Sequence, residues 1–100
     1  MDKTRFILYT FAVELDRKIR EKTARVGVIG LGYVGLPLAV AFARRGFKVT
    51  GIEVYAPRAT ALRKGRSYIE DVPSAELAAL IRSGALTIAD DATAVGKLDA

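Results

Sequence analysis

The chain has 100 residues, of which 51% are hydrophobic and 27% are charged, a composition typical of one small globular domain rather than of a disordered segment. It contains no cysteine and no histidine, which excludes disulfides, zinc–thiolate sites and a histidine general base within this sequence. The formal charge of +5 would suit a nucleic acid or an anionic membrane, but acidic residues are mixed among the basic ones. We therefore expect no nucleic-acid partner, no membrane partner and no metal site.

The chain begins with a segment that predicts an amphipathic helix over residues 11–22. An apolar residue recurs every four positions from Phe11 to Ile19, and acid-before-base pairs at i,i+4 spacing lie on the other faces. We expect residues 1–23 to form a helical extension that packs on its own domain, with docking to a partner subunit as the alternative. Residues 24–100 would form the domain itself.

An apolar stretch over residues 6–13 follows Lys3 and Arg5 and superficially resembles a signal peptide. It is short, runs directly into acidic residues and lacks a small-residue cleavage site. No stretch of the sequence approaches the ~20 apolar residues that a membrane span requires. We therefore expect a cytoplasmic protein, which also fits the absence of cysteine.

The next part of the chain predicts a strand, a helix and a second strand. Residues 24–30 contain a short β-branched run that ends in glycine, which is typical of a buried parallel strand. Residues 36–45 predict a helix that stops at Gly46. Residues 47–54 predict a second strand, with Val54 among its apolar members. Such strand–helix–strand units are almost always right-handed.

Two further helices and a third strand complete the prediction. Residues 57–64 predict a helix that begins with proline, and residues 67–73 an irregular connection. Ser74 is expected to be the N-cap of a helix that ends near Arg82. Residues 86–88 predict a short strand, and the last ten residues suggest only one weak helical turn.

The turn between the first strand and the first of these helices is a GxGxxG motif. Gly30 permits the tight turn, Gly32 lacks a side chain where the backbone must approach a pyrophosphate, and Gly35 lets the helix pack on the strand. The N–H groups and dipole of the helix start would bind the pyrophosphate. Tyr33 and Val34 are expected to line the turn, with Tyr33 near the pyrophosphate.

Glu53 decides between the two nicotinamide cofactors. It stands at the end of the second strand, 18 positions after Gly35, where a carboxylate can accept hydrogen bonds from the adenosine ribose hydroxyls. Each such bond to a charged group contributes roughly 1.5–3 kcal/mol. The carboxylate would repel a ribose phosphate, which favours NAD over NADP. Arg58 is the counter-argument, because a nearby arginine can accommodate that phosphate.

Together these features predict an α/β fold: a Rossmann-type βαβ unit, the N-terminal half of a doubly wound parallel sheet, preceded by an amphipathic helix. In the usual strand order 3-2-1-4-5-6 the first strand is central. Without a fourth strand, residues 26–29 would form an exposed apolar edge, which is an aggregation liability. We therefore expect residues 24–100 to be a partial NAD-binding domain, truncated before its fourth strand, marginally stable and catalytically silent.

Residues 26–54, VGVIGLGYVGLPLAVAFARRGFKVTGIEV, resemble the UDP-glucose/GDP-mannose dehydrogenase family, most of all its bacterial branch that acts on UDP-N-acetyl-hexosamines. The runs GLGYVGLPLA over residues 30–39 and GRSYIEDV over residues 65–72 are more specific than the glycines alone. The resemblance implies a nucleotide-sugar 6-dehydrogenase, which oxidises the primary alcohol of a UDP-sugar to a uronic acid with two NAD. It also implies that the full-length parent is a homo-oligomer.

The resemblance assigns NAD contacts to part of the turn and to the region after the second strand. These residues are Gly30, Gly32, Tyr33, Val34, Gly35, Glu53 and Arg58. Two positions depart from the family: aspartate is usual where this chain has Glu53, and a polar or acidic residue is common where it has Tyr55. The family's catalytic cysteine, with its lysine, asparagine and aspartate helpers, lies later in the sequence. We therefore expect no catalytic residue within this chain.

Three other functions remain open at this point. A different Rossmann dehydrogenase, such as a hydroxy-acid or hydroxyacyl-CoA type, would share the glycines. A non-catalytic NAD-sensing module could report to a partner through the helix at residues 11–22. A basic nucleic-acid binder would show binding that falls steeply with salt and ignores NAD.

Overall fold

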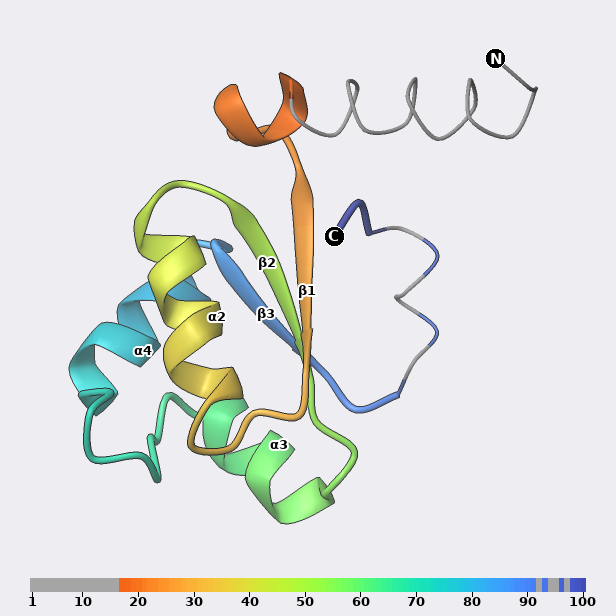
Figure 1. The fold of residues 1–100 in the computed structure, drawn as a ribbon. Helices are drawn as coiled ribbons and strands as arrows, with labels where there is room; N and C mark the ends of the chain where they lie inside the picture. Colours follow the sequence, from red (N-terminus) through yellow and green to blue (C-terminus); the bar gives the residue numbers. More distant parts are fainter. Residues whose placement is uncertain (1–16, 92, 94–95, 97) are drawn as a thin grey trace.

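The structure is a computed structural model that describes residues 17–91, 93, 96 and 98–100 (Figure 1). In chain order its elements are β1 (Arg25–Ile29), α2 (Gly35–Arg44), β2 (Lys48–Ile52), α3 (Ala56–Arg63), α4 (Ser74–Arg82) and β3 (Leu86–Ala89). Every strand and helix predicted between residues 24 and 89 is present, with bounds shifted by at most two residues. The predicted α/β fold is confirmed.

The predicted N-terminal helix lies mostly outside the described residues. Within them, residues 17–20 are helical, and Ile19 of the expected apolar stripe is 45% exposed. The helical turn expected near the C-terminus also lies partly outside the described residues. None of the helices in the part of the chain that the structure describes is long and apolar enough to cross a membrane.

The three strands form one parallel sheet in the order β1-β2-β3. Val26 of β1 pairs with Val49 of β2, which in turn pairs with Leu86 of β3. Parallel neighbours require crossover connections, and α2, α3 and α4 supply them. Figure 1 shows α2 and α4 together on one side of the strands. Because the strands are parallel, the carboxyl ends of β1 and β2 lie at the same edge of the sheet.

The core lies between one face of the sheet and the helices. Val26 and Val28 of β1 belong to it, and Leu36 of α2 and Leu77 of α4 are fully buried at 0% exposure. Burying a leucine side chain contributes about 1.5–3 kcal/mol to folding, so these contacts hold α2 and α4 on the sheet. Ile29 alternates to the opposite face and is 75% exposed.

Two helix boundaries show where the local signals succeed and fail. Gly46 has φ +96 and donates its N–H to Ala43 O at 3.1 Å, which confirms it as the stop of α2. The prediction that Ser74 is an N-cap was wrong, because Pro73 occupies that position and its carbonyl accepts the Leu77 N–H at 3.1 Å. The Ser74 hydroxyl instead accepts a hydrogen bond from the backbone of the α3–α4 connection.

The outer edge of β1 is partly covered by the last described residues. The Gly27 N–H donates to Ala100 O at 2.5 Å, and the Ala100 N–H donates to Arg25 O at 3.2 Å, which is the pattern of parallel strands. A Cβ on Gly27 would lie only 2.2 Å from a methyl carbon of Leu98. The expectation of a bare apolar edge therefore holds only toward its carboxyl end, where Ile29 is exposed.

Candidate functional site

The glycine turn leaves β1 with the geometry expected from its sequence. Gly30 has φ +83, a left-handed conformation that favours glycine, and its N–H donates to Ile52 O at 2.9 Å. A Cβ on Gly35 would lie 1.7 Å from the carbonyl oxygen of Gly30, so only glycine lets α2 start this close to β1. A Cβ on Gly32 would meet nothing within 4 Å. The protein itself therefore requires Gly30 and Gly35, whereas Gly32 faces open space.

The N-terminus of α2 carries no competing anion. Val34 occupies its N-cap position, and among the described residues no side chain caps the helix and no acidic residue lies in its first turn. The first N–H groups of a helix lack intrahelical partners, and the helix dipole places about half a positive charge there. Tyr33 and Val34 flank this end and are 86% and 78% exposed. This helix start can therefore receive an anionic group.

Glu53 is the first residue after β2 and is buried, with 5% of its surface exposed. Its backbone N–H donates to Ala89 O at 2.8 Å, and its Oε2 accepts the Tyr55 N–H at 3.2 Å. Its Oε1 is buried and accepts no hydrogen bond from the described residues. The sequence predicted a strand that extends to Val54, but β2 ends at Ile52 and Val54 is 74% exposed. The chain thus turns Glu53 inward where the strand pattern ends.

Arg58 lies in the first turn of α3, close to two aromatic rings. Its guanidinium carbon is 5.7 Å from the ring centre of Tyr55 and 5.5 Å from that of Tyr68. It also lies 3.9 Å from Glu53 Oε1, which is an ion pair too long to be a hydrogen bond. A cation over an aromatic ring contributes about 0.5–1 kcal/mol at an exposed site, so the two rings help to hold Arg58 beside Glu53.

Tyr68 reaches back to the glycine turn, although it lies on the connection between α3 and α4. Its hydroxyl donates a hydrogen bond to the carbonyl oxygen of Leu31, between the first two glycines. Burial raises the pKa of the Tyr68 phenol, the charge of Glu53 raises it further, and Arg58 lowers it. The hydroxyl therefore remains protonated, and able to donate, through the neutral pH range.

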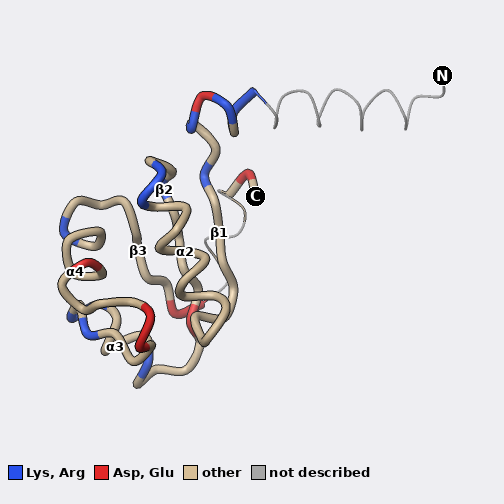
Figure 2. Tube along the Cα trace, turned by 60° about the vertical axis from the view of Figure 1, so that its left-hand side comes forward, with Lys and Arg blue, Asp and Glu red and all other residues tan. Residues whose placement is uncertain are grey.

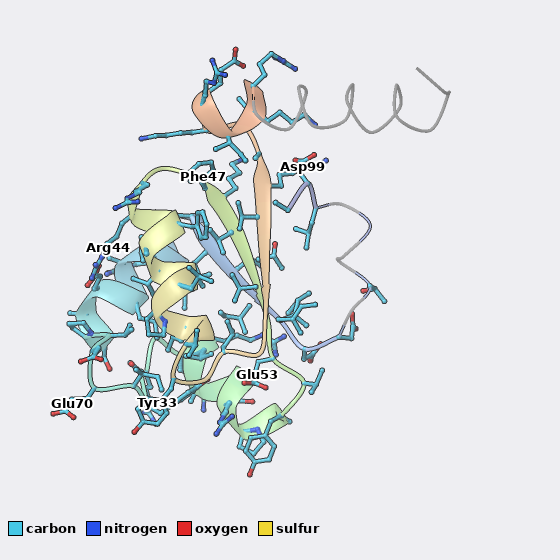
Figure 3. All side chains as sticks on the ribbon, viewed as in Figure 1. Tyr33, Arg44, Phe47, Glu53, Glu70 and Asp99 are labelled. Carbon is cyan, nitrogen blue, oxygen red and sulfur yellow. The ribbon has the colours of Figure 1, made fainter. Side chains whose placement is uncertain are left out.

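A cavity of about 360 Å³ opens between the glycine turn, α3 and this connection. Its lining residues are Gly32, Tyr33, Pro57, Arg58, Ala61, Tyr68 and Ile69. Three predicted site residues, Gly32, Tyr33 and Arg58, thus share one cavity, and Glu53, which does not line it, forms an ion pair with Arg58. Figure 3 shows Glu53 and Tyr33 at the same end of the sheet, with Asp99 at the other. Val34 is exposed and does not line the cavity.

Sequence reasoning missed the part of this cavity that comes from α3 and the connection after it. Ala61 and Ile69 are ordinary apolar residues in the sequence, and nothing in their spacing distinguishes them from core positions. Tyr68 falls within the GRSYIEDV run that carried part of the family resemblance, which was the one available signal. The run did not predict which residue Tyr68 contacts, because its partner Leu31 lies 37 positions away in the sequence.

The basic residues do not concentrate at this cavity. Figure 2 shows lysines and arginines in separate groups, in the segment before β1, beside the start of β2 and around α3, with acidic residues in the first and last of these regions. Part of this charge is neutralised by ion pairs, such as Arg44 with Glu76 and Arg63 with Asp90. The charge of the described residues is therefore mixed rather than gathered on one basic face.

A family model described as the UDP-glucose/GDP-mannose dehydrogenase family, NAD binding domain, matches residues 24–100. The chain belongs to this family. The predicted family and the predicted cofactor, NAD, are both confirmed. In this NAD-binding domain the glycine turn, the N-terminus of α2 and the carboxylate after β2 occupy one end of a parallel sheet, where such folds bind their ligands.

Curated relatives of this NAD-binding domain are nucleotide-sugar dehydrogenases. The UDP-N-acetyl-D-mannosamine dehydrogenase of Yersinia pestis is 48% identical over 44 residues, which are 44% of this chain and 10% of the relative. The UDP-N-acetyl-D-glucosamine 6-dehydrogenase of Pseudomonas aeruginosa is 45% identical over 56 residues, which are 56% of this chain and 13% of the relative. The chain thus matches only a small fraction of the length of these relatives.

Solved structures of the family share the fold. The UDP-N-acetyl-mannosamine dehydrogenase of Staphylococcus aureus superposes with a TM-score of 0.63 at 30% identity, over 69% of this chain and 17% of that one. A ternary complex of the GDP-mannose dehydrogenase of Pseudomonas aeruginosa superposes with a TM-score of 0.62 at 32% identity, over 67% of this chain and 16% of that one. The NAD-binding domain therefore has the architecture of these enzymes in its corresponding part.

Proposed function

We propose that this chain is the NAD-binding portion of a nucleotide-sugar 6-dehydrogenase that oxidises the primary alcohol of a UDP-sugar to a uronic acid. The observation that carries the proposal is the buried Glu53 carboxylate, whose Oε1 has no hydrogen-bond partner among the described residues. A buried polar atom without a partner costs roughly 1–3 kcal/mol, and more when it is charged. A ligand that donates hydrogen bonds at this position would remove that cost.

The adenosine ribose of NAD is such a ligand. Its hydroxyls would donate to Glu53, while the pyrophosphate would lie against the glycine turn and the N-terminus of α2. Gly32 supports this placement, because its missing side chain leaves open space that the protein itself does not use. We accordingly assign NAD contacts to the residues singled out by the sequence: Gly30, Gly32, Tyr33, Val34, Gly35, Glu53 and Arg58.

The surroundings of Arg58 support NAD over NADP. Its guanidinium lies 3.9 Å from Glu53, and 5.7 and 5.5 Å from the ring centres of Tyr55 and Tyr68. A phosphate on the ribose would have to approach the buried Glu53 carboxylate and draw Arg58 away from both rings. Glu53 has one methylene more than the aspartate usual in the family, and its buried position still leaves Oε1 available.

The reaction proposed for the whole enzyme balances with two NAD. One primary alcohol and one water give one carboxylate, two NADH and three protons. NAD, when bound, is the oxidant, and the residues of this chain bind and orient it without taking part in covalent chemistry. The catalytic cysteine expected by resemblance would lie beyond residue 100, so we propose that this chain alone has no turnover.

The remaining features of the parent enzyme are also proposals. The names of the relatives favour an N-acetylated UDP-hexosamine as the substrate class. We further propose a homo-oligomeric, cytoplasmic parent, in which residues 1–23 form a helical extension and residues 24–100 part of the NAD-binding domain. Size-exclusion chromatography of the full-length gene product would test its oligomeric state, and cell fractionation would test its location.

Calorimetric titration of the chain with NAD and NADP tests the proposed cofactor site. We expect saturable binding of NAD, and binding of NADP weaker by about tenfold or more, the loss equivalent to one hydrogen bond to a charged group. Equal or tighter binding of NADP would contradict the role given to Glu53. A folded chain that binds neither nucleotide would contradict the proposed site.

A further inference from the structure

The connection between α3 and α4 contributes a residue to the cavity that no sequence motif assigned. Tyr68 lies on this connection, which passes beside the glycine turn (Figure 1). The Tyr68 side chain contacts both sides of the cavity, because its hydroxyl donates to Leu31 O and its ring lies 5.5 Å from the guanidinium of Arg58. Tyr68 therefore joins the turn that follows β1 to the helix that follows β2.

The contact with Leu31 acts on the backbone of the glycine turn. The carbonyl of Leu31 and the N–H of Gly32 belong to one planar trans peptide, so they point in opposite directions. A bond that fixes the carbonyl thereby fixes the direction of the Gly32 N–H. The Leu31 side chain is 0% exposed, and a Cβ on Gly51 would lie 2.7 Å from it. Leu31 is thus anchored twice, by its side chain in the core and by its carbonyl at Tyr68.

The contact with Arg58 acts on the other half of the cavity. Arg58 lies 3.9 Å from Glu53 Oε1, the carboxylate oxygen that the fold leaves without a hydrogen bond. The ring of Tyr68 therefore limits where the guanidinium can move relative to Glu53. A continuous series of contacts runs from Leu31 through Tyr68 and Arg58 to Glu53.

We infer that Tyr68 is a positioning residue that couples the two halves of the NAD site. Its hydroxyl orients the pyrophosphate-binding turn, and its ring holds Arg58 beside the ribose-binding carboxylate. Orienting both halves before the ligand arrives reduces the ordering that binding must impose, and this strengthens binding without a new ligand contact. The inference rests on the proposed function, because it concerns the same site.

Two variants separate the two contacts. Tyr68→Phe removes the hydroxyl and keeps the ring, whereas Tyr68→Leu removes both. Ser83→Ala is the matched control, because it also deletes a hydroxyl that donates to a backbone carbonyl, that of Leu80 at 3.0 Å, at the far end of α4. Each protein is titrated with ADP-ribose, which carries the pyrophosphate, and with adenosine, which does not, and binding is followed by NMR.

We expect Tyr68→Phe to weaken ADP-ribose by about 3- to 10-fold, the loss typical of one hydrogen bond, and to leave adenosine binding unchanged. Tyr68→Leu should weaken both ligands, and Ser83→Ala neither. In the ligand-free protein, amide exchange at Gly32 should accelerate in Tyr68→Phe while exchange within α4 stays as in the wild type. A purely structural role would instead weaken both ligands equally and accelerate exchange throughout the domain.

The outcomes of this experiment are distinguishable. If the wild-type chain binds ADP-ribose and Tyr68→Phe binds it with the same affinity, the inference is overturned and the proposed function stays intact. Equal weakening of ADP-ribose and adenosine in Tyr68→Phe would also overturn it. A folded wild-type chain that binds neither ligand would overturn the proposed function, and the inference with it.

Discussion

Two carboxylates at opposite ends of the sheet have opposite environments (Figure 3). Asp99 is fully engaged by the protein: its Oδ1 accepts Lys18 Nζ at 2.9 Å, and its Oδ2 accepts the Arg25 N–H at 2.9 Å. These contacts, the backbone N–H first and Lys18 next, lower the pKa of Asp99 to about 2. Glu53 is buried, yet its Oε1 has no hydrogen-bond partner among the described residues.

The difference separates a carboxylate whose hydrogen bonds the fold supplies from one that we propose binds a ligand. Asp99 joins residues 98–100 and the helical residues 17–20 to β1, so its charge stabilises the fold. Among the described residues, Glu53 accepts one hydrogen bond, from the Tyr55 N–H, and forms an ion pair with Arg58 at 3.9 Å. Buried polar atoms are nearly always hydrogen-bonded in folded proteins, so an exception indicates where a partner is missing. The two carboxylates therefore differ in how many of their oxygens the protein hydrogen-bonds, more than in how exposed they are.

Gly35→Ala should produce the largest effect, because this glycine belongs to the fold. The new Cβ would lie 1.7 Å from a backbone oxygen of Gly30, which cannot move without displacing α2 from β1. We expect the free energy of unfolding to fall by about 1–3 kcal/mol or more, although alanine is the better helix former by roughly 1 kcal/mol. Urea denaturation measures this change. A midpoint at or above the wild-type value would show that the close approach of α2 to β1 is not required.

Gly32→Ala should change ligand binding rather than stability, because the role proposed for this glycine is to leave space for the pyrophosphate. Its Cβ would meet no protein atom within 4 Å, so the free energy of unfolding should stay within about 0.5 kcal/mol of the wild type. NAD binding should weaken by tenfold or more, since the methyl group would occupy the space assigned to the pyrophosphate. Denaturation and calorimetry on the same preparation test both halves. A stable variant that binds NAD with wild-type affinity would contradict the placement of the pyrophosphate at Gly32.

Acidification should give the smallest effect, which we expect to follow at Asp99. The pKa of Asp99 is lowered from 3.8 to about 2, so its contribution is fully present above about pH 4 and is lost as the pH falls toward 2. We expect the amide resonances of Gly27 and Ala100, whose backbones are paired, to shift over this interval. In Asp99→Asn this step should be absent. A step of the same size in that variant would assign the titration to another group.

The sequence predicted those parts of the molecule that are determined by residues close together along the chain. The glycines of the turn and the β-branched run before them lie within a dozen positions, so their spacing alone predicted the turn and its neighbours. Glu53 was placed correctly for the same reason, because it directly follows a short apolar strand. The lack of a hydrogen-bond partner at its Oε1 could not be predicted, since that depends on every residue packed around it.

The contacts that the sequence could not predict join distant segments. Tyr68 meets Leu31 across 37 positions, and Lys18 meets Asp99 across 81. A tyrosine or an aspartate in isolation carries no signal of such a partner. The Ser74 cap was wrong for a related reason: its hydroxyl binds the backbone of the preceding connection, and no helix propensity records that competing bond.

The most direct test of the role proposed for Glu53 is a pair of calorimetric NAD titrations on Glu53→Gln and Asp99→Asn. Each variant replaces one carboxylate by its amide, so the two differ in position and not in chemistry. We expect Glu53→Gln to weaken NAD binding by about tenfold or more, the value of a hydrogen bond to a charged acceptor, and Asp99→Asn to bind NAD as the wild type does. Equal weakening in both variants, or wild-type affinity in Glu53→Gln, would contradict the role proposed for Glu53.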